Sequence, residues 1–224
     1  MVWYWFGGNK HYFSSQYLME EANLDTYKTI LKPSEEILFK EKKSKFFGYA
    51  YPISDEEEVK PLIEALRKKH HTANHVCYAW QLGVEEPHYR ANDDGEPNNS
   101  AGMPIYGQIQ SFGVTNILVA VTRIFGGTKL GVGGLITAYK TGAQMALEAS
   151  QIIEKTLQQR FVLKFDYEQM DKVMRTLKQH QIEIISQTME LSCTFIISVR
   201  KQEAEQTLEL FNAMHPPIDI LIKE

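Results

Sequence analysis

The sequence predicts an α+β protein of two domains, and three of its features lead to that class. The last third reads strand, helix, strand, strand, helix, strand, which is the order of a ferredoxin-like domain. Upstream of it, the continuous apolar run Asn116–Phe125 is typical of a strand buried on both faces of a sheet. The polar stretch Glu154–Gln159 separates the two parts. We therefore expect a boundary near Leu157, with domains over residues 24–157 and 158–224.

Length and composition also favour folded domains. The chain has 224 residues, of which 43% are hydrophobic and 23% charged, and such a chain can bury enough apolar surface to offset the entropy of ordering its backbone. Its 24 Lys and Arg against 28 Asp and Glu give a net charge of −4. A protein that is basic over its whole surface is therefore excluded, whereas a local basic face stays open.

Two cysteines, Cys77 and Cys193, lie far apart and lack CxxC spacing. This pattern excludes a disulfide scaffold and a cysteine-rich zinc site, and isolated thiols fit a reducing, cytoplasmic location. No apolar run approaches the roughly 18–20 residues that span a bilayer. We therefore expect no membrane partner, and the sequence does not indicate an oligomeric state.

Residues 1–23 form an atypical N-terminal extension. They hold Trp3 and Trp5, two of the three tryptophans, yet show neither the period of a strand nor that of a helix. Two interpretations compete: an aromatic arm that docks on a partner, or an upstream extension of the reading frame with Met19 nearer the true start. The missing period favours the second.

The first strands follow in order. Stretches rich in aromatic and β-branched residues predict strands over Tyr27–Leu31, Glu36–Glu41 and Ser44–Tyr51, with turns at Pro33-Ser34 and Lys42-Lys43.

A helix is predicted next. Ser54 and Glu57 have the spacing of a capping box. Apolar residues then recur at helical spacing from Val59 to Leu66, and the cations Arg67–Lys69 suit the end of a helix dipole.

The rest of the first domain surrounds the buried strand. We expect a strand over His75–Leu82, a polar loop over residues 84–99 and a short helix over Ser100–Phe112, with Pro104 tolerated in its first turn. After the buried strand comes a glycine-rich loop, Gly126–Gly134, and then a long helix from about Leu135 to beyond Ala149.

The second domain is complete in about 65 residues. Its predicted strands and helices follow the order given above, without an internal repeat. They cover Arg160–Phe165, Glu168–His180 (helix), Ile182–Met189, Leu191–Arg200, Gln202–Met214 (helix) and Ile218–Ile222.

The glycine-rich loop is the first candidate site. Five glycines in nine positions stand between a buried strand and a helix, where backbone N–H groups and a helix dipole favour an anion. Arg123 and Lys129 flank it. The loop is neither a Walker A motif nor a dinucleotide fingerprint, and tight strand-to-helix packing is the alternative. The glycines are Gly126, Gly127, Gly131, Gly133 and Gly134.

The acidic loop is the second candidate, because Asp93, Asp94 and Glu96 place three carboxylates within four residues. Such a set can hold Mg²⁺, take part in acid–base chemistry or accept hydrogen bonds from Arg123. Its spacing is not that of an EF-hand. The alternative is a solvated turn, since Asp-Asp-Gly-Glu-Pro is common in turns.

A histidine cluster and a basic run complete the candidates. His70, His71 and His75 are better explained by a helix end than by zinc. We expect no metal, no cofactor and no catalytic residue set. Lys40, Lys42, Lys43 and Lys45 interleave with aromatic residues, so strands would expose the lysines on one face. That face can contact RNA, or the lysines can protect an edge strand over an aromatic core.

Taken together, three motifs resemble those of the Impact/YigZ family. They are the segments 93–97 (DDGEP), 101–104 (AGMP) and 121–135 (VTRIFGGTKLGVGGL), and His75-x-Cys77-x-Ala79 is similar to the strand before the acidic loop. The resemblance covers roughly residues 26–224. Ile124 stands where the family usually has an aromatic residue, and Asn98-Asn99-Ser100 where Ser-Gly-Thr is commoner.

The resemblance implies a fold and a class of function. The first domain would be a two-layer α/β sandwich like the second domain of a small-subunit ribosomal protein. The second would be like the last domain of elongation factor G. Eukaryotic members look like regulators of translation that compete for the activator of a kinase acting on an initiation factor. Compact two-domain members are typical of bacteria.

Three functions stay open at this point. The first is a non-enzymatic, translation-associated regulator that binds RNA, the ribosome or a translation factor. The second is a Mg²⁺-dependent nucleotide or phosphate-ester enzyme, which would use both loops in one pocket. The third is a protein-binding adaptor in which the carboxylates and Arg123 form only an internal charge network. All three require the acidic loop and Arg123 to lie at one end of the first domain.

Overall fold

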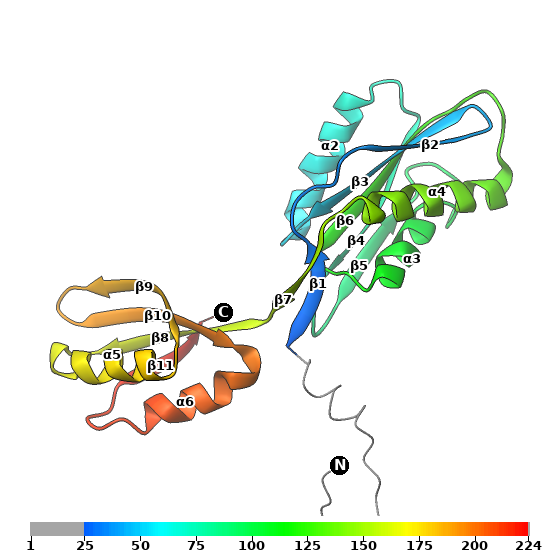
Figure 1. Cartoon of the computed structure of the whole chain (residues 1–224). Helices are drawn as coiled ribbons and strands as arrows, with labels where there is room; N and C mark the ends of the chain where they lie inside the picture. The colour runs from blue at the N-terminus through cyan, green and yellow to red at the C-terminus, as the bar shows by residue number, and fades with distance from the viewer. Residues whose placement is uncertain (1–24, 224) are drawn as a thin grey trace, which may run out of the picture. The chain divides into compact units, whose positions relative to one another are not determined.

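The computed structural model describes residues 25–223, and the predicted extension over residues 1–23 lies outside them. The chain forms two compact units (Figure 1). The N-terminal unit is Tyr27–Lys155, and the C-terminal unit joins Asp25 and Thr26 to the chain from Thr156 onward. Both units combine helices with antiparallel sheets, so the predicted α+β class is confirmed. No helix of residues 25–223 is long and apolar enough to cross a membrane.

A five-stranded antiparallel sheet forms the centre of the N-terminal unit. Its strand order is β2-β3-β6-β4-β5, so the apolar strand β6 lies in the middle. Every residue of β6 except Ile124 is buried, as the sequence predicts for a strand covered on both faces. The strands are β2 (Ile37–Glu41), β3 (Ser44–Pro52), β4 (His75–Leu82), β5 (His88–Asn92) and β6 (Ile117–Ile124).

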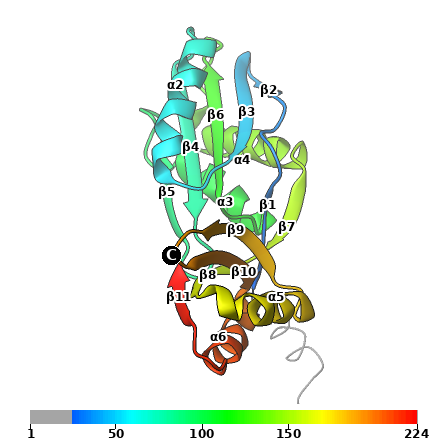
Figure 2. The ribbon, with the colours of Figure 1, turned by 90° about the vertical axis from the view of Figure 1, so that its left-hand side faces the viewer.

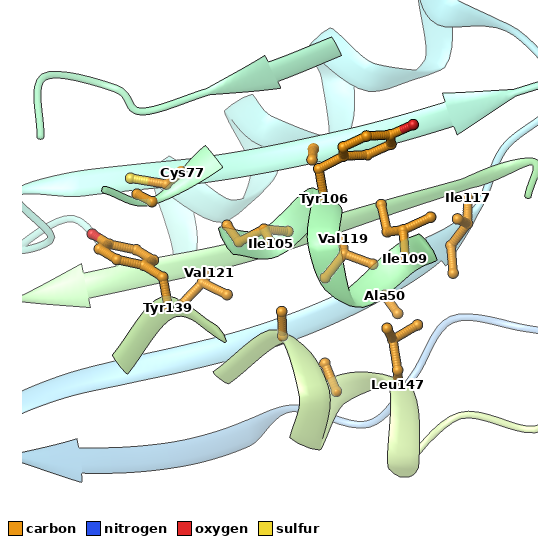
Figure 3. Packing of buried hydrophobic residues seen from close by; sticks show 14 of the residues in the cluster. Ala50, Cys77, Ile105, Tyr106, Ile109, Ile117, Val119, Val121, Tyr139 and Leu147 are labelled. Atoms are coloured by element: carbon orange, nitrogen blue, oxygen red, sulfur yellow. The ribbon is translucent and has the colours of Figure 1, made fainter. Parts of the chain in front are cut away.

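Helices cover both faces of this sheet (Figure 2). Helices α3 (Gly102–Phe112) and α4 (Gly131–Glu148) pack over one face, against Val119 and Val121 of β6 (Figure 3). Helix α2 (Val59–Lys69) packs over the other, against Leu118 and its neighbours. The unit therefore has three layers where two were expected, because α2 places Val59, Ile63 and Leu66 on the second face.

Three local features differ from the sequence-based expectation. The capping box is formed by Asp55 and Glu58, because Asp55 Oδ1 accepts from Glu57 N at 2.7 Å and Glu58 Oε1 from the N–H groups of Ser54 and Asp55. The polar loop over residues 84–99 contains β5, whose mostly polar residues pair with the edge of β4. The long helix begins at Gly131 rather than Leu135 and ends at Glu148.

A two-stranded ladder joins the ends of the N-terminal unit. Strand β1 (Thr26–Ile30) pairs with β7 (Ile152–Thr156). Leu31 N donates to Gln151 O at one end and Leu157 N to Asp25 O at the other. The sequence did not predict β7, because its polar composition indicated a boundary and its pairing partner is distant along the chain.

The C-terminal unit has the predicted ferredoxin-like order. Its sheet runs β11-β8-β10-β9 and is antiparallel throughout. Both helices pack over one face of it, around Phe161, Phe195 and Phe211. The elements are β8 (Gln158–Phe165), α5 (Met170–Gln179), β9 (Glu183–Met189), β10 (Cys193–Arg200), α6 (Ala204–Asn212) and β11 (Asp219–Lys223). Short 3₁₀ turns, η1 (Glu56–Glu58), η2 (Tyr167–Gln169) and η3 (Lys201–Glu203), precede α2, α5 and α6.

A polar cluster under the end of α2 makes the stability of the N-terminal unit depend on pH. Tyr49 donates its hydroxyl hydrogen to Glu36 and contacts His70 Nε2 at 2.5 Å. The His70 ring also lies 4.4 Å from the ring of Phe47, centroid to centroid. Burial lowers the pKa of His70 below its ordinary value of 6.5. The pKa of Glu36 is also lowered, because its carboxylate contacts Lys69.

We expect the free energy of unfolding to fall as the pH drops below about 6.5. The folded state holds His70 neutral, and the unfolded chain binds the extra proton, so this contribution is present above pH 6.5 and lost below it. Urea unfolding between pH 7.5 and pH 5 measures the slope, with pH values chosen above the range in which Glu36 titrates. His70→Phe should flatten the slope and His71→Phe, at the exposed neighbour, should not. An equal slope in all three proteins would contradict the assignment.

Candidate functional site

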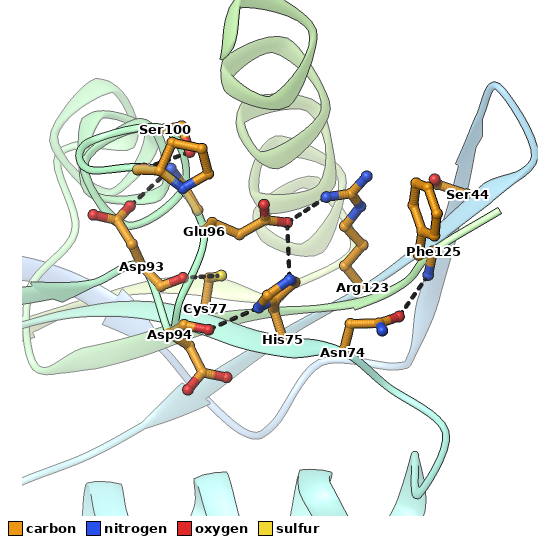
Figure 4. A network of polar contacts seen from close by, with 12 residues as sticks. Ser44, Asn74, His75, Cys77, Asp93, Asp94, Glu96, Ser100, Arg123 and Phe125 are labelled. Carbon is orange, nitrogen blue, oxygen red and sulfur yellow. Dashed lines mark hydrogen bonds and ion pairs between the residues drawn. The ribbon is translucent and has the colours of Figure 1, made fainter. Parts of the chain in front are cut away.

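The acidic loop and the end of β6 meet through a buried ion pair (Figure 4). Glu96 Oε1 accepts hydrogen bonds from Arg123 Nη1 at 2.6 Å and from the Tyr139 hydroxyl at 2.8 Å. Only 4% of the Glu96 side chain and 7% of the Arg123 side chain are exposed. The structure thus brings the acidic loop to the end of β6, which leads into the glycine-rich loop, with Glu96 and Arg123 as the point of contact.

The sheet register places Arg123 between two rings on neighbouring strands. Phe46 of β3 and His75 of β4 both pair with Arg123, and His75 Nε2 lies 3.9 Å from Glu96 Oε1. The guanidinium carbon is 5.6 Å from the centre of the Phe46 ring and 5.4 Å from that of Phe125. Among residues 25–223, the buried Arg123 Nε has no hydrogen-bond partner. The guanidinium is therefore held by one carboxylate and two aromatic faces.

Burial shifts the titration of the groups beside this pair. It raises the pKa of the Tyr139 hydroxyl far above its ordinary value, and the nearby Cys77 and Glu96 act in the same direction. It likewise raises the pKa of the Cys77 thiol, whose Sγ donates to Asp93 O at 3.0 Å. Both groups are neutral at physiological pH, so neither is an activated nucleophile or base.

Asp93 holds the start of α3. Its Oδ1 accepts from the N–H groups of Ala101 and Gly102 at 2.9 and 2.8 Å, and its Oδ2 accepts from Asn99 N at 2.8 Å. Ala101 and Gly102 lie at the N-terminus of α3, where N–H groups have no partner inside the helix. Asp93 therefore acts as the cap that fixes the loop to α3.

Asp94 ties the same loop to β4 and α2. Its Oδ2 accepts from Val76 N at 2.6 Å, its Oδ1 from Arg67 Nη2 at 2.5 Å, and its carbonyl contacts His75 Nδ1 at 2.8 Å. In the part of the chain that the structure describes, Arg123 forms an ion pair with the third carboxylate, that of Glu96, and none with Asp93 or Asp94. Within residues 25–223, no three His, Cys, Asp or Glu side chains are arranged to hold a metal ion.

The five glycines of the second loop have different environments. A Cβ on Gly126 would lie 2.0 Å from the carbonyl carbon of Lys43, so only glycine fits there. Gly127 and Gly131 have positive φ angles of 87° and 74°, which favour glycine. Gly133 and Gly134 lie inside the first turn of α4, and Lys129 is exposed just before it. Close backbone approach and turn geometry explain three of the five glycines without a ligand.

The four candidate lysines surround the tip of the β2–β3 hairpin, and all four are exposed. Lys40 and Lys45 are directly opposite each other in the register. Lys42 and Lys43 form the turn, both with left-handed φ angles of 43° and 67°. Phe39 and Phe46, also opposite each other, point to the other face, with ring centroids 6.1 Å apart. Phe47 and Tyr49 alternate with Phe46 along β3 and lie on the same face of the sheet as Lys45. The predicted separation of lysines from aromatic residues therefore holds for Phe39 and Phe46 and is wrong for Phe47 and Tyr49.

A family model described as the Impact N-terminal domain matches residues 42–147. A curated relative from Haemophilus influenzae, named "IMPACT family member", is 32% identical over 190 residues, which cover 82% of this chain and 89% of the relative. The chain belongs to the IMPACT family. The family resemblance seen in the sequence motifs is thereby confirmed.

Another member and a solved structure agree with this assignment. The Escherichia coli IMPACT family member YigZ is 34% identical over 147 residues, 65% of this chain and 72% of YigZ. A crystal structure described as that of a hypothetical protein is 27% identical and has a TM-score of 0.66, with 89% of this IMPACT family chain and 98% of that chain covered.

Sequence reasoning missed two side chains of this IMPACT family site. Tyr139 lies in the third turn of α4 and Phe125 directly after β6, and neither was proposed as a functional residue. Tyr139 carries no local signal, because a tyrosine on the apolar face of a helix is ordinary core. Phe125 sits inside the family motif, and its position between Arg123 and Gly126 was the available signal.

Proposed function

We propose that this protein is a non-enzymatic, translation-associated regulator that binds RNA, free or on the ribosome, through the lysines of the β2–β3 hairpin. Membership of the IMPACT family supports the link to translation, because the resemblance implies that its eukaryotic members regulate that process. The observation that carries the binding mode is the hairpin tip, where Lys40, Lys42, Lys43 and Lys45 are exposed. Among residues 25–223, none of these four lysines forms an ion pair with a carboxylate.

The charge of the whole chain agrees with a local binding patch. The net charge is −4, so long-range attraction to RNA is weak and contacts must come from a few cations. Each lysine that neutralises a phosphate releases counterions, and single-stranded nucleic acid gives a slope of about −0.7 per contact in log K against log salt. Four contacts would give a slope of roughly −3.

The engagement of the acidic loop favours binding over catalysis. A Mg²⁺-dependent phosphate-ester enzyme needs carboxylate oxygens that are free to bind the ion. Here Asp93 and Asp94 accept hydrogen bonds from backbone N–H groups and from Arg67, and Glu96 pairs with Arg123. The loop carboxylates are thus used to build the domain, which supports the regulator proposal over the enzyme alternative.

A lysine-to-alanine series tests the proposal. A variant with all four hairpin lysines replaced by alanine should bind tRNA or ribosomes at least about tenfold more weakly at low salt, and its salt slope should be smaller by roughly 3. Gel-shift and filter-binding titrations over a range of salt concentrations measure both values.

The matched control replaces four other exposed lysines, Lys140, Lys155, Lys164 and Lys178. It has the same change in net charge, so it should retain the wild-type slope. Equal loss in the two variants would show that binding is non-specific. Absence of binding by the wild type at low salt would eliminate the proposal.

A further inference from the structure

A phenylalanine ring is exposed at the end of the central strand. Phe125 directly follows β6, and 42% of it is exposed. Its backbone is fixed on both sides, because Phe125 N donates to Asn74 Oδ1 at 2.9 Å and Gly126 N to Ser44 Oγ at 3.1 Å. The Arg123 guanidinium lies over its ring. The ring thus lies against a buried cation (Figure 4), and it is still partly exposed to solvent.

The residue after the exposed ring packs against the lysine turn. Gly126 packs so closely against Lys43 that an added Cβ would be 2.0 Å from the Lys43 carbonyl carbon and 2.3 Å from Ser44 N. Phe125 is therefore one residue away from the contact with the turn that carries Lys42 and Lys43. Lys40 and Lys45 face the opposite side of the hairpin from Phe46 and hence from Arg123.

We propose that Phe125 is a stacking platform for an unpaired base, and that the ligand of the hairpin is single-stranded RNA; this deepens the proposed function and rests on it. An aromatic face beside cations is the combination that binds single strands, since bases stack on the ring while lysines follow the phosphates. A base inside a duplex already stacks on its neighbours and cannot reach the ring. A flexible strand can also pass from Phe125 over the turn to Lys40 and Lys45, which face the other side of the hairpin.

Binding of labelled oligouridine and of a blunt RNA duplex of the same length tests the inference. Phe125→Ala and Phe125→Leu should each weaken oligouridine binding roughly tenfold, with the salt slope unchanged because no phosphate contact is lost. The hairpin lysine variant should instead lose slope. Phe125→Trp should retain affinity, and its added tryptophan fluorescence should be quenched when a base stacks on it.

Tyr167→Ala is the matched control, because Tyr167 is an aromatic residue of the C-terminal unit with 51% exposure; it should bind oligouridine like the wild type. Wild-type affinity in both Phe125→Ala and Phe125→Leu, alongside a loss in the lysine variant, would overturn the stacking inference and leave RNA binding standing. So would equal affinity for duplex and single strand. If the wild type binds no RNA at all, the proposed function fails first.

Discussion

Replacing Arg123 by methionine is expected to lower the free energy of unfolding by about 3–5 kcal/mol. The change leaves the Glu96 carboxylate in a site where 4% of it is exposed, without the cation that Nη1 supplies at 2.6 Å. An ionised carboxylate that is buried and unpaired is far more costly than a missing attraction, because it has lost its water as well. The guanidinium also stops filling the space between the rings of Phe46 and Phe125.

A triple replacement separates the buried charge from the packing. Glu96→Leu, Arg123→Met and Tyr139→Phe together remove the carboxylate, its cation and its hydroxyl donor, so this variant should be more stable than Arg123→Met alone. Urea unfolding followed by the fluorescence of the buried Trp80 compares the two. Arg90→Ala, which breaks the exposed pair with Glu56, should cost no more than about 1 kcal/mol. An Arg123→Met loss as small as that would refute the role of the buried pair.

Gly126→Ala is the second change with a large expected effect, a loss of about 3 kcal/mol in unfolding free energy. The new methyl group would lie 2.0 Å from the carbonyl carbon of Lys43 and 2.2 Å from its oxygen. These are backbone atoms of a tight turn, so the hairpin or the loop has to move. For a protein of this size the melting temperature should fall by roughly 6–12 °C.

Replacing Gly133 by alanine provides the control, and it should change the free energy of unfolding in the opposite direction. No atom lies within 4 Å of a Cβ added there, and the residue is in the first turn of α4 without a positive φ. Gly133→Ala should raise the free energy of unfolding by about 0.5 kcal/mol, since alanine restricts the unfolded chain. Thermal unfolding by circular dichroism measures both variants. Two losses of similar size would show that the loop needs glycine throughout.

These glycines show why local patterns identify a site better than they explain it. The cluster at residues 126–134 was found from composition alone, and the anion site it suggested rested on the helix starting at Leu135. The helix starts at Gly131, because glycine does not prevent a helical turn when α4 can pack Leu135 and Tyr139 against the sheet. The close approach of Gly126 to Lys43 connects segments far apart in the sequence, and no local rule reveals it.

The acidic loop shows the same limit for side-chain partners. The sequence placed three carboxylates and Arg123 near one another, and Glu96 does meet Arg123. Asp93 and Asp94 instead accept hydrogen bonds from backbone N–H groups at the start of α3 and of β4. The fold places these N–H groups next to the two carboxylates. Strands and helices with a clear period were predicted closely. Strands β5 and β7 were not predicted, because their polar residues give no strand pattern and they form strands by pairing with β4 and β1.

The β1–β7 ladder has a consequence for the order of folding. Arg200 reaches Asp25 with two hydrogen bonds, of 3.1 and 2.9 Å, across a separation of 175 residues in the chain. Once residues 27–155 have folded, the ladder already holds Asp25 beside Leu157, so only the segment from Leu157 to Arg200 remains to be closed. The shorter closure saves about 1 kcal/mol of loop entropy. Folding of the N-terminal unit thus raises the effective concentration of Asp25 near Arg200.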